Sequence, residues 1–279
     1  MSQIDIEHLR SWIGRQDSGT EEVSSSLVAK FLATFDMKGE TAKGAAAPLA
    51  IHLCLAHPAV PTAELGPDGH PARGGFLPPV PLPRRMWAGG ELVISDDIRI
   101  GEAVTRRSTI RDVTMKEGRS GTLCFVTVDH EITSNGRLVM SERQDIVYRD
   151  AGRTPAPAPG VEAAAPGMHR KTVAASAPFL FRYSALTFNG HRIHYDQPYV
   201  TGEEGYPGLI VHGPIQMTML LQFAADLKGR RPAKFSFRSL SPLFDIADFT
   251  LNAAEEGEEL KLWTSYPDGP YAMEARARW

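Results

Sequence analysis

Residues 188–199 read FNGHRIHYDQPY, and residues 205–216 read GYPGLIVHGPIQ. Hydrogen-bonding and titratable side chains are concentrated here: within 28 residues the chain carries Asn189, His191, Arg192, His194, Asp196 and His212. Three of its nine histidines therefore fall in this region. Because imidazole has an ordinary pKa of about 6.5, it exchanges protons readily near neutral pH. The concentration of histidines predicts acid/base chemistry in this part of the chain.

Two features of this region indicate the kind of reaction. Asn189 and His194 lie five residues apart after a predicted apolar helix, so a short loop could point both side chains into one pocket. Further on, Pro214 favours a helix start, which leaves the amide of Gly213 without an intrahelical partner. The N-terminus of a helix stabilises developing negative charge, such as the enolate oxygen of a thioester. A base beside such a site is typical of a hydratase or dehydratase, or of a thioesterase.

Composition restricts the partners of the chain. It has 279 residues, of which 42% are hydrophobic, and its net charge of −3 comes from 30 basic and 33 acidic side chains. This length and apolar fraction suffice for about two domains with packed cores. Basic and acidic residues are interspersed, so nucleic acid is not an expected partner. The two cysteines, Cys54 and Cys124, lie in apolar segments without CxxC spacing, which predicts buried thiols rather than a disulfide or a zinc site.

Signals for a membrane, a secretory route or a cofactor are not recognisable in the sequence. No stretch approaches the ~18 to 20 consecutive apolar residues of a membrane helix. Asp5 and Glu7 stand where a signal peptide would be basic and then apolar. The chain has no P-loop and no GxGxxG after a predicted strand, and its histidines and aspartates lack zinc-ligand spacing. We therefore expect a cytoplasmic protein that uses no membrane, metal or cofactor.

Two irregular segments organise the chain. Residues 151–168 read AGRTPAPAPGVEAAAPGM, in which 13 of 18 residues are Ala, Pro or Gly, and this composition is typical of a semi-rigid linker. It separates an N-terminal part, residues 1–150, from a C-terminal part, residues 169–279. Residues 58–83 hold eight prolines and four glycines, which excludes a helix or a central strand. We expect a long ordered loop there, and loops of that length inside a domain are usually functional or mobile.

Each part runs helix first and strands after. The predicted helices are 27–35, 43–56, 179–188 and 214–227. The predicted strands are 90–95, 103–115, 122–133 and 137–148 in the first part, and 233–240, 249–253, 258–265 and 271–279 in the second. Residues 32–36 and 185–189 share a Thr-Phe pair at an offset of 153 residues, which indicates a duplicated domain. One central helix wrapped by a curved antiparallel sheet would satisfy both parts.

The run Asn189-x-x-x-x-His194-x-Asp196-x-x-Tyr199, followed by residues 210–213 (IVHG), resembles the hydratase-2 motif of MaoC-type (R)-specific enoyl-CoA hydratases. Further strings at 74–90, 116–121 and 144–149 resemble the mesaconyl-C4-CoA hydratase and itaconyl-CoA hydratase branch of the FAS1-like dehydratase group. The resemblance implies an α+β fold, a double hot-dog in which each half is a curved antiparallel sheet around a central helix. Residues 1–150 would be a non-catalytic hot-dog that binds the substrate tail, and residues 169–279 the hydratase-type hot-dog.

The resemblance also implies residue roles, with one departure. The family usually has Asp where this chain has Asn189, and an amide cannot exchange a proton at neutral pH. His194 would then be the general acid/base, Asn189 would orient the water or the thioester, and Gly213 would donate its amide to the thioester oxygen. Asp196 could orient His194. In the first half Asp36 occupies the slot of Asn189 without a histidine five residues on, so it either marks a lost site or only ends a helix.

The implied activity is that of a hydro-lyase acting on an acyl-CoA thioester. In the itaconyl-CoA and mesaconyl-C4-CoA hydratase branch, water would add to a C5 dicarboxylyl-CoA and give citramalyl-CoA, as in itaconate degradation. The free carboxylate of such a substrate needs a cation. The expected substrate-binding residues are Arg84, Arg85, Trp87, Arg192 and His212, although the adjacent arginines could equally be solvated or hold CoA phosphates.

Several alternatives remain open at this stage. They are an (R)-specific enoyl-CoA hydratase or 3-hydroxyacyl dehydratase of broader specificity, an acyl-CoA thioesterase, and a non-catalytic acyl-CoA-binding protein. The chain could be a pseudo-dimeric monomer, because two hot-dogs complete one unit, or it could pair further into a homodimer.

Overall fold

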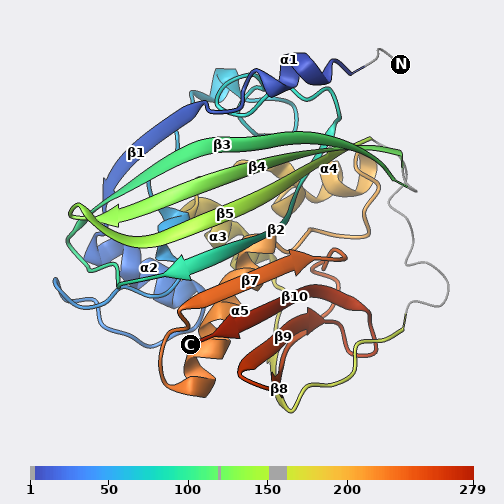
Figure 1. Cartoon of the computed structure of the whole chain (residues 1–279). Coiled ribbons are helices and arrows are strands. Elements are labelled where there is room, and N and C mark those ends of the chain that lie inside the picture. Colours follow the sequence, from blue (N-terminus) through green and yellow to red (C-terminus); the bar gives the residue numbers. More distant parts are fainter. Residues whose placement is uncertain (1–3, 119–120, 151–161) are drawn as a thin grey trace.

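The ten strands of the described residues form one antiparallel sheet (Figure 1), whose successive side chains point to opposite faces. The computed structural model describes residues 4–118, 121–150 and 162–279. The strands are β1 (Gln16–Glu22), β2 (Arg84–Ile94), β3 (Ala103–Gly118), β4 (Gly121–Ser134), β5 (Arg137–Arg149), β6 (His169–Val173), β7 (Lys234–Ser239), β8 (Phe249–Glu256), β9 (Glu259–Ser265) and β10 (Tyr271–Arg278). All eight predicted strands are present. The α+β class expected from the sequence is confirmed.

The order of the strands shows the duplication. The sheet runs β1-β3-β4-β5-β2-β7-β10-β9-β8-β6, so each half contributes five neighbouring strands in the same relative order, and the halves join where β2 pairs with β7. One core of buried side chains continues from the first half into the second. The linker prediction for 151–168 falls largely on residues 151–161, which lie outside the described residues. Both cysteines are buried free thiols, as predicted.

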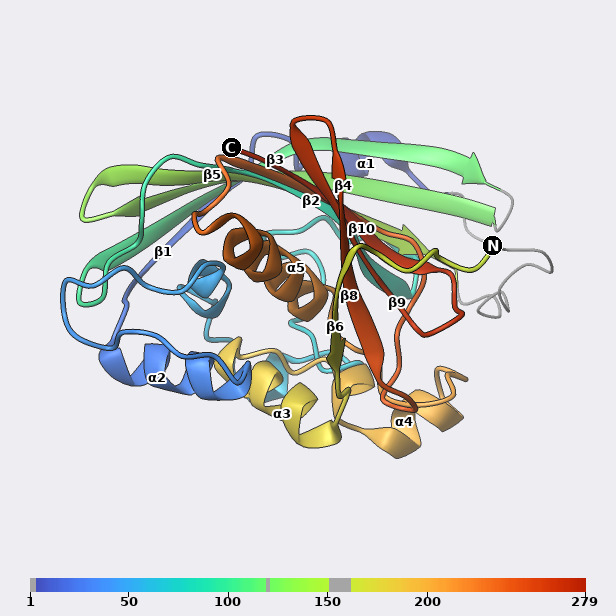
Figure 2. The same cartoon turned by 90° about the horizontal axis from the view of Figure 1, so that it is seen from below.

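Apart from the short N-terminal helix, which contacts β3, the helices occupy the concave side of this sheet (Figure 2). The helices are α1 (Ile6–Arg10), α2 (Ser25–Thr34), α3 (Ala177–Leu186), α4 (Gln197–Gly202) and α5 (Gly213–Lys228), with short 3-10 helices η1 (Ile51–Cys54), η2 (Thr62–Glu64) and η3 (Arg192–His194). The long helix α5 starts at the predicted Pro214 turn and ends at Gly229, whose φ of 67° is a left-handed C-cap. Its apolar side chains pack against β7 to β10, with α2 and α3 beyond it. No helix of the described part is both long and apolar enough to cross a bilayer.

The helix predicted over 43–56 is wrong, and with it the long central helix expected in the first half. Only η1 is helical there. The amides of Gly44 and Ala47 donate to the carbonyls of Ile100 and Ile98, so this segment is hydrogen-bonded to the loop between β2 and β3 instead of forming a helix. Ala50 also has a left-handed φ of 65°, which an α-helix excludes. An apolar, alanine-rich run predicted a helix that tertiary hydrogen bonds override.

The ends of α2 and α3 correct the register of the internal repeat. Asp36 and Phe188 both follow a helix with left-handed φ values, 51° and 47°. The amides that come next, of Met37 and Asn189, donate to carbonyls five residues back in both cases. The structural offset is therefore 152 residues (188 − 36), not 153, and Met37 rather than Asp36 matches Asn189. Asp36 marks the turn after a helix, which was the alternative interpretation.

Candidate active site

His194 ends η3, and its surroundings fix which of its nitrogens can react. Its side chain is buried, with Nδ1 2.7 Å from the carbonyl oxygen of Ile210. A carbonyl can only accept, so Nδ1 carries the hydrogen and Nε2 holds the free lone pair. The amide of Ile210 in turn donates to the carbonyl of Ile193 at 2.9 Å, which fastens the two segments together. Burial lowers the pKa of His194 to about 4, so the imidazole is neutral at pH 7.

The start of α5 lies against this imidazole. The rings of His194 and His212 are stacked, with centroids 3.5 Å apart and an angle of 15° between the planes. His212 is the N-cap residue of α5, directly before Gly213, and its Nε2 lies 2.9 Å from the Ser184 hydroxyl. The structure therefore brings His194 next to the helix tip that carries the Gly213 amide. A neutral base thus lies beside a helix N-terminus.

Asn189 shapes the loop between α3 and η3. Its side-chain oxygen accepts a hydrogen bond from the amide of His191 at 3.0 Å. Asn189 thereby supports the turn that carries His191, and its contact with water or thioester stays a prediction. Asp196 does not orient His194: it caps α4 through the Tyr199 amide and binds the guanidinium of Arg192 at 2.8 to 2.9 Å.

The predicted substrate-binding arginines have different surroundings. Arg192 is held by Asp196 and lies over the ring of Tyr199. The Nε atom of Arg84 lies 3.3 Å from the Glu204 carboxylate. Neighbouring residues of a strand point to opposite faces, which places Arg85 apart from Arg84 and on the same face as Trp87.

Trp87 and Arg85 extend from β2 toward the site. A side chain added at Gly213 would meet the ring of Trp87 at 3.4 Å, so the indole covers the first turn of α5. The positive charge of Arg85 helps to lower the pKa values of Asp68, His70 and His191. Burial is the largest cause of the low pKa values of the two imidazoles. Arg85 is thus a cation close to the histidine cluster, which consists of His70, His191, His194 and His212.

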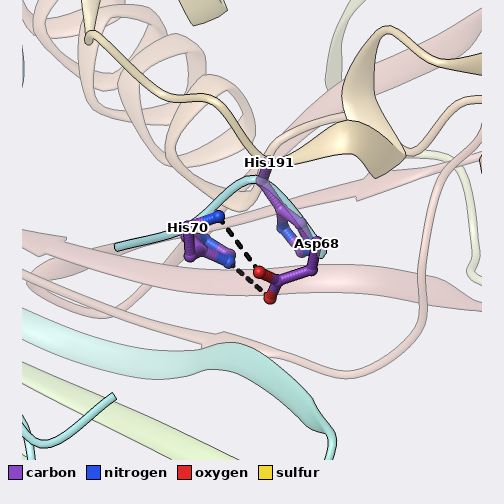
Figure 3. Close-up of side chains that lie close together, drawn as sticks. All are labelled: Asp68, His70 and His191. Atoms are coloured by element: carbon purple, nitrogen blue, oxygen red, sulfur yellow. Dashed lines mark hydrogen bonds and ion pairs between the residues drawn. The ribbon is translucent and has the colours of Figure 1, made fainter. Parts of the chain in front are cut away.

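A turn of the proline-rich loop reaches the same region, which the sequence did not predict. The amide of Gly69 donates to the carbonyl of Gly66 at 2.9 Å, which closes the turn around Asp68. One carboxylate oxygen of Asp68 lies 2.9 Å from Nδ1 of His70, and the other accepts from the His70 amide at 3.0 Å (Figure 3). The rings of His70 and His191 have centroids 4.0 Å apart.

Asp68, His70 and His191 also contain the donor atoms of a possible metal site. One ligand atom from each lies within 4.8 Å of the others, and two imidazoles with one carboxylate suit several divalent transition metals. The carboxylate already accepts two hydrogen bonds, however, and the charge of Arg85 opposes a second cation. Sequence spacing missed this cluster because its members come from opposite halves. The Pro67-Asp68-Gly69 turn signature was the available signal.

Comparisons with known proteins agree with this architecture. The family model for hydroxyacyl-thioester dehydratase type 2 matches residues 50–245. A mesaconyl-C(4)-CoA hydratase from Chloroflexus aurantiacus is 43% identical over 269 residues, which is 95% of each chain. The structure of a MaoC-like dehydratase from Phytophthora capsici superposes over 99% of each chain with a TM-score of 0.70 at 14% identity. A Mycobacterium tuberculosis protein with a double hotdog fold covers 95% of each chain at a TM-score of 0.55 and 14% identity. The expected double hot-dog fold is confirmed.

Proposed function

Because the chain belongs to the hydroxyacyl-thioester dehydratase type 2 family and is a hydro-lyase of acyl thioesters, we propose that it hydrates a C5 dicarboxylyl-CoA. The substrate would be mesaconyl-C4-CoA or itaconyl-CoA, and the product citramalyl-CoA. The likeness to a mesaconyl-C(4)-CoA hydratase supports this substrate class. The observation that carries the proposal is the stacking of His194 on His212 at the tip of α5. This stacking places the proton acceptor of His194 beside the N-terminus of α5.

The proposed chemistry follows from these two groups. Nε2 of His194 accepts a hydrogen bond from water, whose oxygen attacks the β-carbon of the enoyl thioester. In mesaconyl-C4-CoA the double bond is conjugated to the thioester, so its electron pair moves toward the thioester oxygen, which the Gly213 amide and the N-terminal end of α5 stabilise. In itaconyl-CoA the double bond is not conjugated to the thioester, so the α-carbon must first lose a proton and the γ-carbon gain one, which gives the same conjugated thioester. The proton lost by the water then returns to the α-carbon. Asn189 cannot carry that proton, because an amide has no titratable group near neutral pH.

Recognition of a second carboxylate is assigned to Arg85. The free carboxylate of the substrate needs a cation close to the reacting carbons. Arg85 lies near the histidine cluster, whereas Arg84 and Arg192 each have a carboxylate partner. Trp87, on the same face of β2, would pack against the acyl group beside Gly213.

The test is a parallel assay of itaconyl-CoA, mesaconyl-C4-CoA and crotonyl-CoA. With mesaconyl-C4-CoA we expect the conjugated enoyl absorbance to be lost without release of free thiol. With both C5 substrates we expect citramalyl-CoA to be identified by mass spectrometry. Release of free CoA from the dicarboxylyl substrates would assign a thioesterase instead. Faster turnover of crotonyl-CoA than of both C5 substrates would favour a broader enoyl-CoA hydratase. Binding of all three thioesters without any product would indicate an acyl-CoA-binding protein.

A further inference from the structure

We propose that Asp68 and His70 form a second acid/base dyad in this active site, which takes the place of the carboxylate absent at position 189. This inference rests on the proposed function, because it assigns a proton carrier to the same hydration. The dyad comes from the proline-rich loop of the first half, between η2 and β2. The N-terminal half would then supply part of the catalytic machinery as well as a surface for the substrate.

The turn that carries the dyad is fitted closely onto the motif loop of the second half. The carbonyl of Asp68 accepts from the amide of Arg192 at 2.9 Å, and the Arg192 guanidinium donates to the carbonyl of Pro67 at 3.0 Å. A Cβ atom on Gly69 would lie 1.9 Å from the carbonyl oxygen of Gly190, and one on Gly190 would lie 2.6 Å from that of Gly69. Two backbones can approach this closely only where both residues are glycine. This close backbone contact therefore forms a junction that holds the loop of the first half in a fixed position against the second half.

The surroundings of the imidazoles distinguish His70 from the others. His194 bonds a backbone carbonyl and His212 a hydroxyl, and both are neutral partners. In the part of the chain that the structure describes, His70 is the member of this cluster with a carboxylate on its Nδ1. A carboxylate there stabilises the imidazolium that forms when Nε2 takes a proton, as the aspartate does in a Ser-His-Asp triad. His70 is therefore the imidazole best suited to hold a proton between two half-steps.

The dyad carries the proton during hydration of mesaconyl-C4-CoA, whose double bond is conjugated to the thioester. The rings of His70 and His194 are connected through His191, with centroid distances of 4.0 and 5.4 Å. The attacking water would lie within reach of Nε2 of His194 and of His70, and one of its O–H bonds breaks as its oxygen forms a bond to the β-carbon. Nε2 of His70 takes that proton, and the double-bond electron pair becomes the enolate at the Gly213 amide. The imidazolium of His70, paired with Asp68, then protonates the α-carbon while the thioester carbonyl forms again. Water has been added, His70 is neutral again, and His194 has stayed neutral throughout.

The experiment compares Asp68→Asn and His70→Gln with the unchanged protein, using mesaconyl-C4-CoA and itaconyl-CoA. We expect kcat to fall ~100-fold or more in His70→Gln and ~10-fold or more in Asp68→Asn, with KM changed less than threefold. Asp68→Glu should recover part of kcat, because the carboxylate is restored. His8→Gln and Asp268→Asn, which alter exposed residues far along the chain from this site, serve as matched controls.

Each other outcome contradicts the proposal. Unchanged kcat in both variants would remove the dyad while the activity of the parent protein still supports the hydratase. A fall in kcat that follows a lowered unfolding temperature, without recovery in Asp68→Glu, would assign the pair a purely structural role. Loss of activity with EDTA and its return with Zn²⁺ or Mn²⁺ would assign a metal site to Asp68, His70 and His191. A parent protein that hydrates neither substrate would overturn both the function and the dyad.

Discussion

At the scale of single residues, the bond from Nδ1 of His194 to the Ile210 carbonyl decides the chemistry. It leaves Nε2 as the acceptor, and burial keeps the ring neutral at pH 7. We expect His194→Ala to lower kcat by at least ~100-fold on the C5 thioesters, because the attacking water loses the acceptor that positions it. Steady-state kinetics with His8→Ala as control, and circular dichroism to confirm folding, check this. A variant with unchanged kcat would exclude His194 from the reaction.

A second prediction at this scale concerns Arg85. If its guanidinium binds the free carboxylate, Arg85→Met removes a charged hydrogen bond worth ~1.5 to 3 kcal/mol, or about 10- to 100-fold in KM. The effect should be confined to mesaconyl-C4-CoA and itaconyl-CoA, since crotonyl-CoA has no second carboxylate. Arg107→Met, which alters an exposed ion pair with Glu131, is the control variant. An equal rise in KM for the C5 substrates and for crotonyl-CoA would show that Arg85 does not bind the free carboxylate.

Which residues the sequence could identify depended on their distance along the chain. His194 and Gly213 were predicted to share a pocket because each stands in a short, recognisable local pattern. Asp68 and His70 were not, since their neighbour His191 belongs to the other half and only the folded sheet brings the loops together. The role of Asp196 was misjudged for a related reason. Proximity to His194 in sequence suggested a contact, but its carboxylate turns to Arg192 and the α4 amides.

At the scale of elements, the turn formed by residues 65–71 depends on two backbones in direct contact. Gly69→Ala introduces a side chain at φ +86° and a clash with the Gly190 carbonyl. Gly14→Ala is the matched control, because Gly14 has φ +85° but no atom within 4 Å of the added carbon. We expect Gly69→Ala to lower the free energy of unfolding by ~1 to 3 kcal/mol more than Gly14→Ala, and to lower kcat as well. Urea denaturation and kinetics measure both; equal losses in the two variants would show that the junction has no role.

Elements were predicted well where the hydrophobic period was clear. Strand β4 alternates between buried and less buried side chains along most of its length, and α5 carries a Pro214 start and a Gly229 stop. Strands β1 and β6 lie at the two edges of the sheet, and their sequences, QDSGTEE and HRKTV, are polar. Because most of their side chains are not buried, neither strand shows the alternation of apolar and polar residues that predicts a strand. The start of β2 was missed for another reason: this central strand, between β5 and β7, begins at Arg84, six residues before the predicted strand 90–95, because its first residues follow the proline-rich loop directly and do not alternate between apolar and polar.

At the scale of the whole molecule, the two halves share one strand order but differ in their helices. The second half places α5 against its strands, whereas the first half has only η1 at the corresponding point of the chain. The helix tip that would stabilise an enolate therefore exists in one half. The sequence predicted one active site per chain from the lack of a histidine after Asp36. The structure adds a physical reason, since the first half also lacks the long helix.

Buried imidazoles make the stability of the whole molecule depend on pH. Burial lowers the pKa of His70, His191, His194 and His212 in the folded chain, that of His194 to about 4, whereas an unfolded histidine titrates near 6.5. Unfolding therefore takes up protons below about pH 6.5, and the free energy of unfolding falls as the pH drops from 6.5 toward 4. The pKa of Asp68 is lowered from 3.8 to about 2, so protonation of this carboxylate lowers the free energy of unfolding further only as the pH falls below about 4.

His194 should account for about 3 kcal/mol of this loss, since each unit of pKa difference corresponds to ~1.4 kcal/mol. Urea denaturation at pH 7.5, 6.5, 5.5 and 4.5 measures the free energy of unfolding of the parent protein, His194→Gln and His8→Gln. We expect the decrease between pH 7.5 and 4.5 to be ~2 to 3 kcal/mol smaller in His194→Gln than in the parent protein. His8→Gln, which alters an exposed side chain, is the control and should match the parent protein. The same decrease in all three proteins would mean that the ring of His194 takes up its proton in the folded chain near its ordinary pKa, because water reaches it.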